Sequence, residues 1–351
     1  MGLLAAGFDD EAAAVYLQSH RVSTSRQYQS VWTKFLSFFN SHGLSPQDVS
    51  VGVVCNFLTF QATVQGLQYR TLSCYRSALR LPLYWGCGLE INTFDSDQFL
   101  RGLFNWKPPR RAAPMPFWSL NVLLSFLQSG RFEPLDSLSA ELITQKTLCL
   151  LLLASGRRIS EIAGLSRLSR PDPSGVSMTL DWVPDFRPKH DDPGFRPAPP
   201  SISFLASDGS VSLSLCPVRA YRTFLRFSTL WVDSLGPQGR HDSLWAQPGN
   251  PLPLSIRQLT TTFIKVVREA ISDAGLPACP SIGPHQVRKL AASHSRRAGR
   301  DEVSLQRLMG FSSVTILRKN YVSDVPPLNI ACVLPGGPYF PPRDYELSDS
   351  D

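Results

Sequence analysis

The stretch Ser155-Gly156-Arg157-Arg158-Ile159-Ser160-Glu161-Ile162 places an arginine on a turn directly after a strongly apolar segment. Residues 148–153 before it are all apolar, which predicts a helix that is buried on most sides. Gly156 ends that helix and begins the turn. Glu161 follows Arg158 by three residues, close enough to orient its guanidinium. Because an Arg–Glu pair at a helix end is most often structural, this stretch indicates chemistry only together with others.

A second segment, Pro284-His285-Gln286-Val287-Arg288, combines a histidine and an arginine at the expected start of a helix. His285 and Arg288 are one helical turn apart and share a face at the helix N-terminus. That arrangement suits the binding of an anion. Taken alone, the segment fits a solvated basic turn equally well.

A third segment, Leu308-Met309-Gly310-Phe311-Ser312-Ser313, precedes a predicted helix with a tyrosine near its end. Val314, Leu317 and Tyr321 share one side of that helix. A tyrosine in such a position ordinarily packs in a core, so only the combination of the three segments gives it another meaning.

In this order the three segments resemble the tyrosine recombinase or phage integrase family. The catalytic domain of that family carries an arginine, a lysine, a His-x-x-Arg pair, a His or Trp, and a tyrosine. The resemblance implies that Tyr321 is the nucleophile and that Glu161 supports the first arginine. It implies that the remaining catalytic positions are Arg158, Lys189, His285, Arg288 and Phe311.

Two of these positions leave alternatives open. Lys189 lies in Arg187-Pro188-Lys189-His190, and with His190 and Arg196 close by it can equally belong to a surface loop. Phe311 stands where the family usually has His or Trp. Since Phe donates no hydrogen bond, either a neighbouring donor substitutes or the chemistry is weakened; one such donor contributes about 2.7 to 4 kcal/mol.

The chemistry of such a site follows from its residue types. Attack of a phenolate on a phosphodiester raises the charge on the non-bridging oxygens, and two arginine forks stabilise that charge. A lysine or histidine can give the leaving 5′ oxygen a proton, and a histidine can help to deprotonate the tyrosine. The covalent phosphotyrosine retains the bond energy. We therefore expect neither a metal nor any other cofactor.

The expected fold is mainly α with a small antiparallel β-sheet. Helical periodicity from Ser23 to Gly43 opens an all-helical first domain. β-Branched and apolar runs broken by proline predict the strands, with an exposed proline-rich excursion between the first two. We expect helices over 46–63, 69–85, 95–104, 119–128, 139–154, 219–230, 255–275, 285–298, 302–309 and 313–322, and strands over 176–183, 201–205 and 211–215.

With 351 residues the chain exceeds what one hydrophobic core usually organises, so two domains are expected. Its 43% hydrophobic and 18% charged residues indicate a globular protein. The resemblance implies a helical, SAM-like core-binding domain and a catalytic domain that form a C-shaped DNA clamp. The expected boundaries are 1–104 for the first domain, 105–116 for a basic Pro-rich linker, 117–325 for the catalytic domain and 326–351 for a Pro-rich acidic tail.

The formal net charge of +7 favours a polyanionic partner, and with the motifs we expect this to be double-stranded DNA. The resemblance also implies a homo-oligomer, a tetramer on synapsed DNA. Basic residues cluster in the first domain, the linker and the last catalytic segments. Those expected to bind DNA are Arg76, Arg80, Lys107, Arg110, Arg111, Lys289, Arg296, Arg297, Arg318 and Lys319.

The seven cysteines are scattered and include no C-x-x-C pair, which indicates reduced thiols and an intracellular protein. No secretory signal or apolar run long enough for a membrane span is evident. We expect a soluble protein of the nucleus without a membrane partner.

Cys216-Pro217-Val218-Arg219-Ala220-Tyr221 and the proline-rich excursion resemble, more narrowly, the recombinases of DIRS-like and Ngaro-like retrotransposons. The function this implies is site-specific cleavage and rejoining of DNA in the recombination or integration of a mobile element. Two alternatives stay open. One is a catalytically silent DNA-binding protein derived from such an enzyme; the other is a relaxing enzyme like the type IB topoisomerases.

Overall fold

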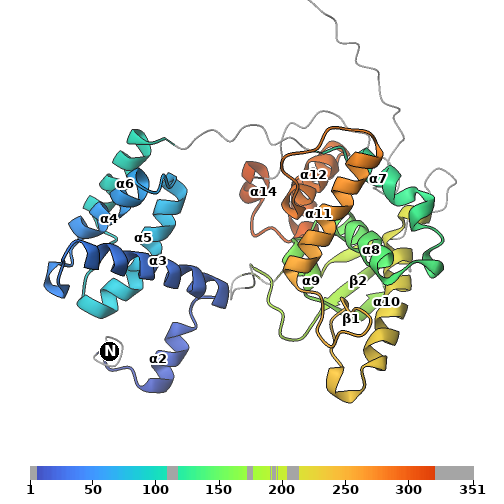
Figure 1. Cartoon of the computed structure of the whole chain (residues 1–351), viewed down its shortest axis with the longest axis horizontal. Helices are drawn as coiled ribbons and strands as arrows, with labels where there is room; N and C mark the ends of the chain where they lie inside the picture. Colours follow the sequence, from blue (N-terminus) through green and yellow to red (C-terminus); the bar gives the residue numbers. More distant parts are fainter. Residues whose placement is uncertain are drawn as a thin grey trace, which may run out of the picture. The chain divides into compact units, whose positions relative to one another are not determined.

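The computed structural model describes residues 6–108, 118–171, 177–189, 191, 195, 197–203 and 213–320. The chain divides into two compact units, Met1–Pro114 and Met115–Asp351, and each is described by itself (Figure 1). The predicted linker residues 109–116 and the predicted tail lie outside the described residues.

The first unit is helical in its described part. Phe35, Phe57 and Leu79 are almost fully buried in one hydrophobic core between the helices. The prediction of a single helix over 46–63 was wrong, because the Ser50 side chain accepts a hydrogen bond from Val53 N and starts a new helix. The helices are α2 (Asp10–Leu17), α3 (Val22–Ser41), α4 (Val51–Thr63), α5 (Tyr69–Cys87) and α6 (Phe94–Trp106), with the 3₁₀ turn η1 (Pro46–Asp48).

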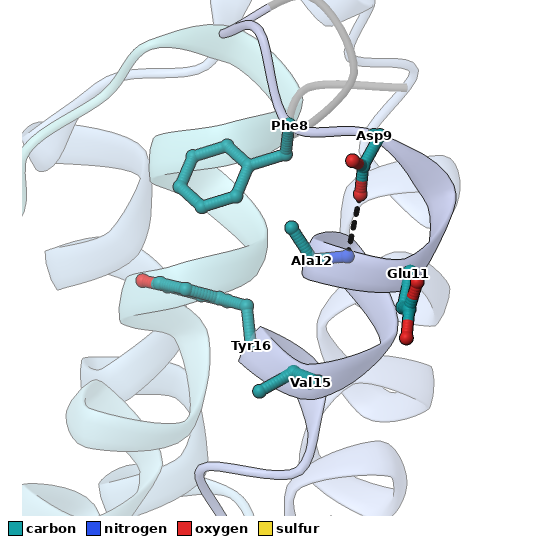
Figure 2. A pocket seen from close by; sticks show the side chains of 6 residues that line it. All are labelled: Phe8, Asp9, Glu11, Ala12, Val15 and Tyr16. Atoms are coloured by element: carbon teal, nitrogen blue, oxygen red, sulfur yellow. Dashed lines mark hydrogen bonds between the residues drawn. The ribbon is translucent and has the colours of Figure 1, made fainter.

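The short helix α2 was not predicted from the sequence. Asp9 caps its start by accepting a hydrogen bond from Ala12 N at 2.7 Å. Phe8 and Tyr16 place their rings edge-on against Trp85 of α5, with centroids 6.0 and 5.7 Å away. Figure 2 shows the shallow pocket beside α2, lined by Phe8, Asp9, Glu11, Ala12, Val15 and Tyr16. These aromatic contacts attach α2 to its own unit.

The second unit contains a three-stranded antiparallel sheet in the order β1–β2–β3. Its strands are β1 (Leu165–Pro171), β2 (Ser177–Trp182) and β3 (Ser201–Ser203). Strand β1 was missed because its leucines, Leu165 and Leu168, are three residues apart, which is a helical spacing. The predicted strand over 211–215 was wrong for residues 213–215, which form the 3₁₀ turn η4 (Leu213–Leu215). Residues 211 and 212 lie outside the described part.

Helices surround the buried helix α8, which contacts α10, α11 and α12 (Figure 1). Residues 143–153 of α8 are all buried, as the apolar run predicted. The helices are α7 (Leu120–Gln128), α8 (Ala140–Ser155), α9 (Ile159–Ala163), α10 (Pro217–Ser234), α11 (Ile256–Asp273), α12 (Pro284–Arg297), α13 (Glu302–Met309) and α14 (Val314–Asn320), with the 3₁₀ turns η2 (Gly130–Phe132), η3 (Leu135–Ser137) and η5 (Pro237–Gly239).

The end of α12 packs with α13 and α14 around a small hydrophobic cluster of its own. This cluster is distinct from the main core of the unit. Its buried members are Ala292, Leu305, Met309, Phe311 and Leu317. The third sequence segment therefore belongs to a small subassembly that is attached to the rest of the unit mainly through α12.

None of the described helices is both long and apolar enough to cross a membrane.

Candidate active site

Two glycine turns face each other at the centre of the site. Gly156 ends α8 with φ +58°, and Gly310 ends α13 with φ +64°. This left-handed conformation favours glycine. A Cβ atom on Gly156 would lie 2.3 Å from Cε of Met309, and one on Gly310 would lie 2.1 Å from Nη1 of Arg157. A side chain at either position would therefore displace Met309 or Arg157 in addition to straining the left-handed backbone.

Arg288 of α12 joins these two turns. Its Nη1 donates to the carbonyl oxygen of Gly156 at 3.1 Å, and its Nη2 donates to that of Gly310 at 3.5 Å. Its Cζ lies 3.8 Å from the centroid of the Phe311 ring. Arg288 is fully buried. The arginine thus connects the three motif segments.

Glu161 holds the arginine turn through both carboxylate oxygens. Its Oε1 accepts from Nη1 of Arg158 at 2.8 Å, and its Oε2 accepts from Nη1 of Arg157 at 3.4 Å. Glu161 and Arg157 are almost fully buried, whereas the Arg158 side chain keeps 15% of its surface exposed. The backbone is fixed as well, since Nε1 of Trp245 donates to the carbonyl of Ile162. Arg158 is thereby the guanidinium of this turn that a ligand can reach.

His285 is an exposed residue in the first turn of α12. Desolvation of the covered part of its imidazole is the largest cause that lowers the pKa of His285 below the ordinary value. Lys289, Arg288, Arg158 and Lys189 lower it further by their positive charge. The lowered pKa favours the neutral form of this ring. A neutral imidazole can accept a proton.

Lys189 is exposed on the proline-rich excursion between β2 and β3. The start of the excursion is anchored because Val183 N donates to the carbonyl of Gly164 at 2.9 Å and the Phe186 ring packs on that glycine. Its end is anchored at Ala198, whose carbonyl accepts from Nη2 of Arg157 at 2.8 Å. His190 and Arg196, the competing cations of this stretch, lie outside the described residues.

Tyr321 also lies outside the described residues, as it directly follows Asn320, the last residue of α14. Leu317 of α14 and Phe311, which precedes that helix, are fully buried in the same hydrophobic cluster. The side chain of Lys319 is not described.

The predicted DNA-binding residues of the first unit have partners within the unit. Arg76 pairs with Asp97 at 2.6 Å and also donates to Ser96, which leaves 17% of its side chain exposed. Arg80 remains 52% exposed with Glu90 at 4.0 Å. Lys107 donates to the carbonyl of Ala62 at 2.6 Å. Arg110 and Arg111 lie outside the described residues.

In the second unit, Glu302 contacts two of the predicted DNA-binding arginines. Arg296 of α12 lies 3.4 Å from its Oε1, and Arg318 of α14 lies 2.6 Å from its Oε2. Arg297 is exposed and Lys289 half-buried. The carboxylate of Glu302 therefore neutralises part of a cationic surface that also carries the end of α14.

Arg157 is the site residue that sequence reasoning missed. Two adjacent arginines were visible in the sequence, but only the fold distinguishes the buried one from the accessible one. Among the described residues, no group of three His, Cys, Asp or Glu side chains is placed to hold a metal ion. The side chains that do converge are cations, suited to an anion such as a phosphodiester.

No protein-family model matches this sequence. No curated protein matches it either. Solved structures do match. The lambda integrase(75–356) dimer bound to a COC′ core site is 13% identical, with a TM-score of 0.54 over 89% of this chain and 92% of that chain. The XerH site-specific recombinase in a post-cleavage complex with palindromic difH is 17% identical, with a TM-score of 0.54 over 84% and 74%.

A third match is the Tn1549 transposon integrase in complex with transposon right end DNA. It is 17% identical, with a TM-score of 0.53 over 80% of this chain and 82% of that chain. All three are structures of tyrosine recombinases or integrases. The described helices and the three-stranded sheet therefore have the fold of tyrosine recombinases.

Proposed function

We propose that this chain is a tyrosine recombinase that cleaves and rejoins double-stranded DNA through a covalent 3′-phosphotyrosine. The observation that carries the proposal is that Arg288 of the second motif segment donates to the carbonyl oxygens of both Gly156 and Gly310, which joins the three segments at one place. His285 lies one turn before Arg288 on α12, and burial, followed by the charges of the nearby cations, lowers the pKa of its ring. The tyrosine recombinase fold and the position of Tyr321 directly after α14 support the same function.

In the proposed reaction, Arg158 binds a non-bridging oxygen of the scissile phosphate, oriented by Glu161 at 2.8 Å. Arg288 provides the second fork once its guanidinium turns from the glycine carbonyls to the phosphate. Both forks stabilise charge that grows in the transition state. His285 takes the proton of Tyr321, and Lys189 gives a proton to the leaving 5′ oxygen. The reverse sequence rejoins the strand.

The proposed partners are duplex DNA and further copies of this chain, which together exchange strands in a synapse. Arg80, Arg297 and Lys289 offer charge to the phosphate backbone outside the reacting centre. We place the protein in the nucleus, acting on the termini of a mobile element like the DIRS-like and Ngaro-like retrotransposons. The match to a transposon integrase supports a mobile element of some kind.

A second candidate is a silent DNA-binding protein on the same fold. It is favoured by one observation, that Arg288 is fully buried against Phe311, a residue without a hydrogen-bond donor. If this arrangement persists on DNA, the phosphate receives only one of the two guanidinium groups. Binding would then survive while cleavage is lost.

The deciding experiment uses nicked suicide duplexes with candidate element termini and separates the products on a denaturing gel. Cleavage at a nick releases a short fragment, so a covalent protein–DNA adduct accumulates. The proposal predicts an adduct with the unsubstituted chain and none with Arg158→Gln. Tight binding to the same duplexes without any adduct would favour the silent protein instead.

A further inference from the structure

Arg157 is an unusual feature of the site because its long charged side chain is only 1% exposed. Burial lowers the pKa of Arg157, and the Glu161 carboxylate opposes that effect. A guanidinium is retained in such a place only where its contacts replace the lost water. The contacts of Arg157 reach three separate parts of the proposed site.

The first contact is to the residue that orients Arg158. Nη1 of Arg157 lies 3.4 Å from Oε2 of Glu161, while Oε1 of the same carboxylate accepts from Arg158 at 2.8 Å. Because one guanidinium occupies each oxygen, the carboxylate cannot rotate without losing a charged hydrogen bond. Arg157 thereby restricts the direction in which Arg158 points.

The second contact is to the excursion that carries Lys189. Nη2 of Arg157 donates to the carbonyl of Ala198 at 2.8 Å, nine residues beyond Lys189. The third contact is to the turn before α14. The guanidinium fills the space beside Gly310 so closely that a Cβ there would meet Nη1 at 2.1 Å. The same side chain thus contacts the first segment, the excursion that carries Lys189, and the third segment.

We infer that Arg157 is a positioning residue, which holds Glu161, the 198 carbonyl and the Gly310 turn in the arrangement that aims Arg158 at the phosphate. This inference rests on the proposed function for its catalytic consequence, but the orientation of Arg158 can be measured without any reaction. An apolar side chain of similar length would keep the packing against Gly310 and lose the two polar links, to Glu161 and to the carbonyl of Ala198.

The test therefore compares Arg157→Met with Arg157→Lys in the full chain. Methionine is flexible and fills a similar space without charge. Lysine restores the charge but, as a single ammonium group, lacks the planar fork that reaches two acceptors. The matched control is Arg131→Met, which removes an ion pair with Glu269 at 2.8 Å elsewhere in the same unit. Thermal unfolding of each variant checks that it is folded.

The first readout is the Nε–H NMR signal of Arg158 in the protein without DNA, assigned by its loss in Arg158→Lys. We expect this signal to shift and broaden in Arg157→Met, to be partly restored in Arg157→Lys, and to stay unchanged in Arg131→Met. An unchanged Arg158 signal in a folded Arg157→Met protein would overturn the inference. If Arg157→Met does not fold, the Arg158 signal is compared between Arg157→Lys and the unsubstituted chain. An unchanged signal in Arg157→Lys would then overturn the inference.

The second readout is single-turnover cleavage of a nicked suicide duplex at saturating protein. Arg157→Met should slow it by up to about 100-fold, because a misplacement of a reacting group by about 1 Å can cost that much in rate. DNA affinity should change less than about twofold, since no phosphate contact is lost. Equal cleavage rates would refute the catalytic consequence. Absence of an adduct with the unsubstituted chain would refute the proposed function alone, and the NMR signal still decides the positioning role.

Discussion

The Cζ atom of the Arg288 guanidinium lies over the ring of Phe311, 3.8 Å from the ring centroid. The negative face of the ring attracts the cation, and both residues are fully buried. Phe311 occupies the position where a His or Trp is expected from the family resemblance. In this chain that position stabilises an arginine by its ring face and donates no hydrogen bond to a phosphate.

Replacing Phe311 with tryptophan should raise the rate of DNA cleavage. The indole keeps the ring face for Arg288 and adds an N–H donor, and one such donor contributes up to about 10²- to 10³-fold in rate. We expect a gain of at least about tenfold for Phe311→Trp in single-turnover cleavage. Phe311→Leu is the control, since it removes the ring and adds no donor. A rate unchanged by Phe311→Trp would mean that another group already supplies the hydrogen bond.

Gly310→Ala should lower the free energy of unfolding of the second unit by more than the cost of the left-handed backbone conformation alone. A residue with a Cβ pays about 1 to 2 kcal/mol for that conformation. At Gly310 the added Cβ also meets Nη1 of Arg157 at 2.1 Å. Gly275→Ala is a matched control, because Gly275 has φ +65° with nothing within 4 Å. Urea unfolding of the two variants should show a larger loss for Gly310→Ala; equal losses would contradict the close fit of the turns.

The protein should become less stable as the pH falls, because the folded state disfavours protonation of His294. Burial, followed by the charge of Arg297, lowers the pKa of His294 to about 4. The unfolded chain binds a proton near pH 6.5 and the folded chain does not, so stability is complete above 6.5 and is lost as the pH falls toward 4. The slope for one proton is at most about 1.4 kcal/mol per pH unit. His294→Gln should flatten the pH dependence of the free energy of unfolding, measured with urea between pH 7 and 5. An identical pH dependence in both proteins would show that His294 is not its cause.

The sequence predicts the three motif segments, and the fold joins the first and the third through Arg288 of the second. The sequence does not show which of the two adjacent arginines, Arg157 or Arg158, is buried. That depends on Gly310, more than 150 residues away, because the absence of a side chain there leaves room for the guanidinium of Arg157. Strand β1 was hidden by the helical spacing of its leucines. The pairing of Arg318 with Glu302 was hidden because only the packing of α14 on α13 brings them together.

Glu302→Gln should strengthen DNA binding and make it more salt-dependent. The substitution releases Arg296 and Arg318 from the shared carboxylate. Each additional phosphate contact steepens the log–log salt dependence by about 0.9, so two released arginines give up to about 1.8. Fluorescence anisotropy on a labelled duplex across a salt series measures the slope. Glu269→Gln, which releases Arg131 of η2 from its ion pair, should leave the slope unchanged; equal changes in both variants would indicate a nonspecific charge effect.

The most direct test of the account is to map the residue that becomes linked to DNA. Adduct formed on a nicked suicide duplex is digested with nuclease and protease, and the peptide carrying the nucleotide is sequenced by mass spectrometry. We expect a 3′-phosphate ester on Tyr321, with no adduct in Tyr321→Phe even though that variant binds the duplex as tightly as the unsubstituted chain. An adduct on another residue, or one that persists in Tyr321→Phe, would contradict the account.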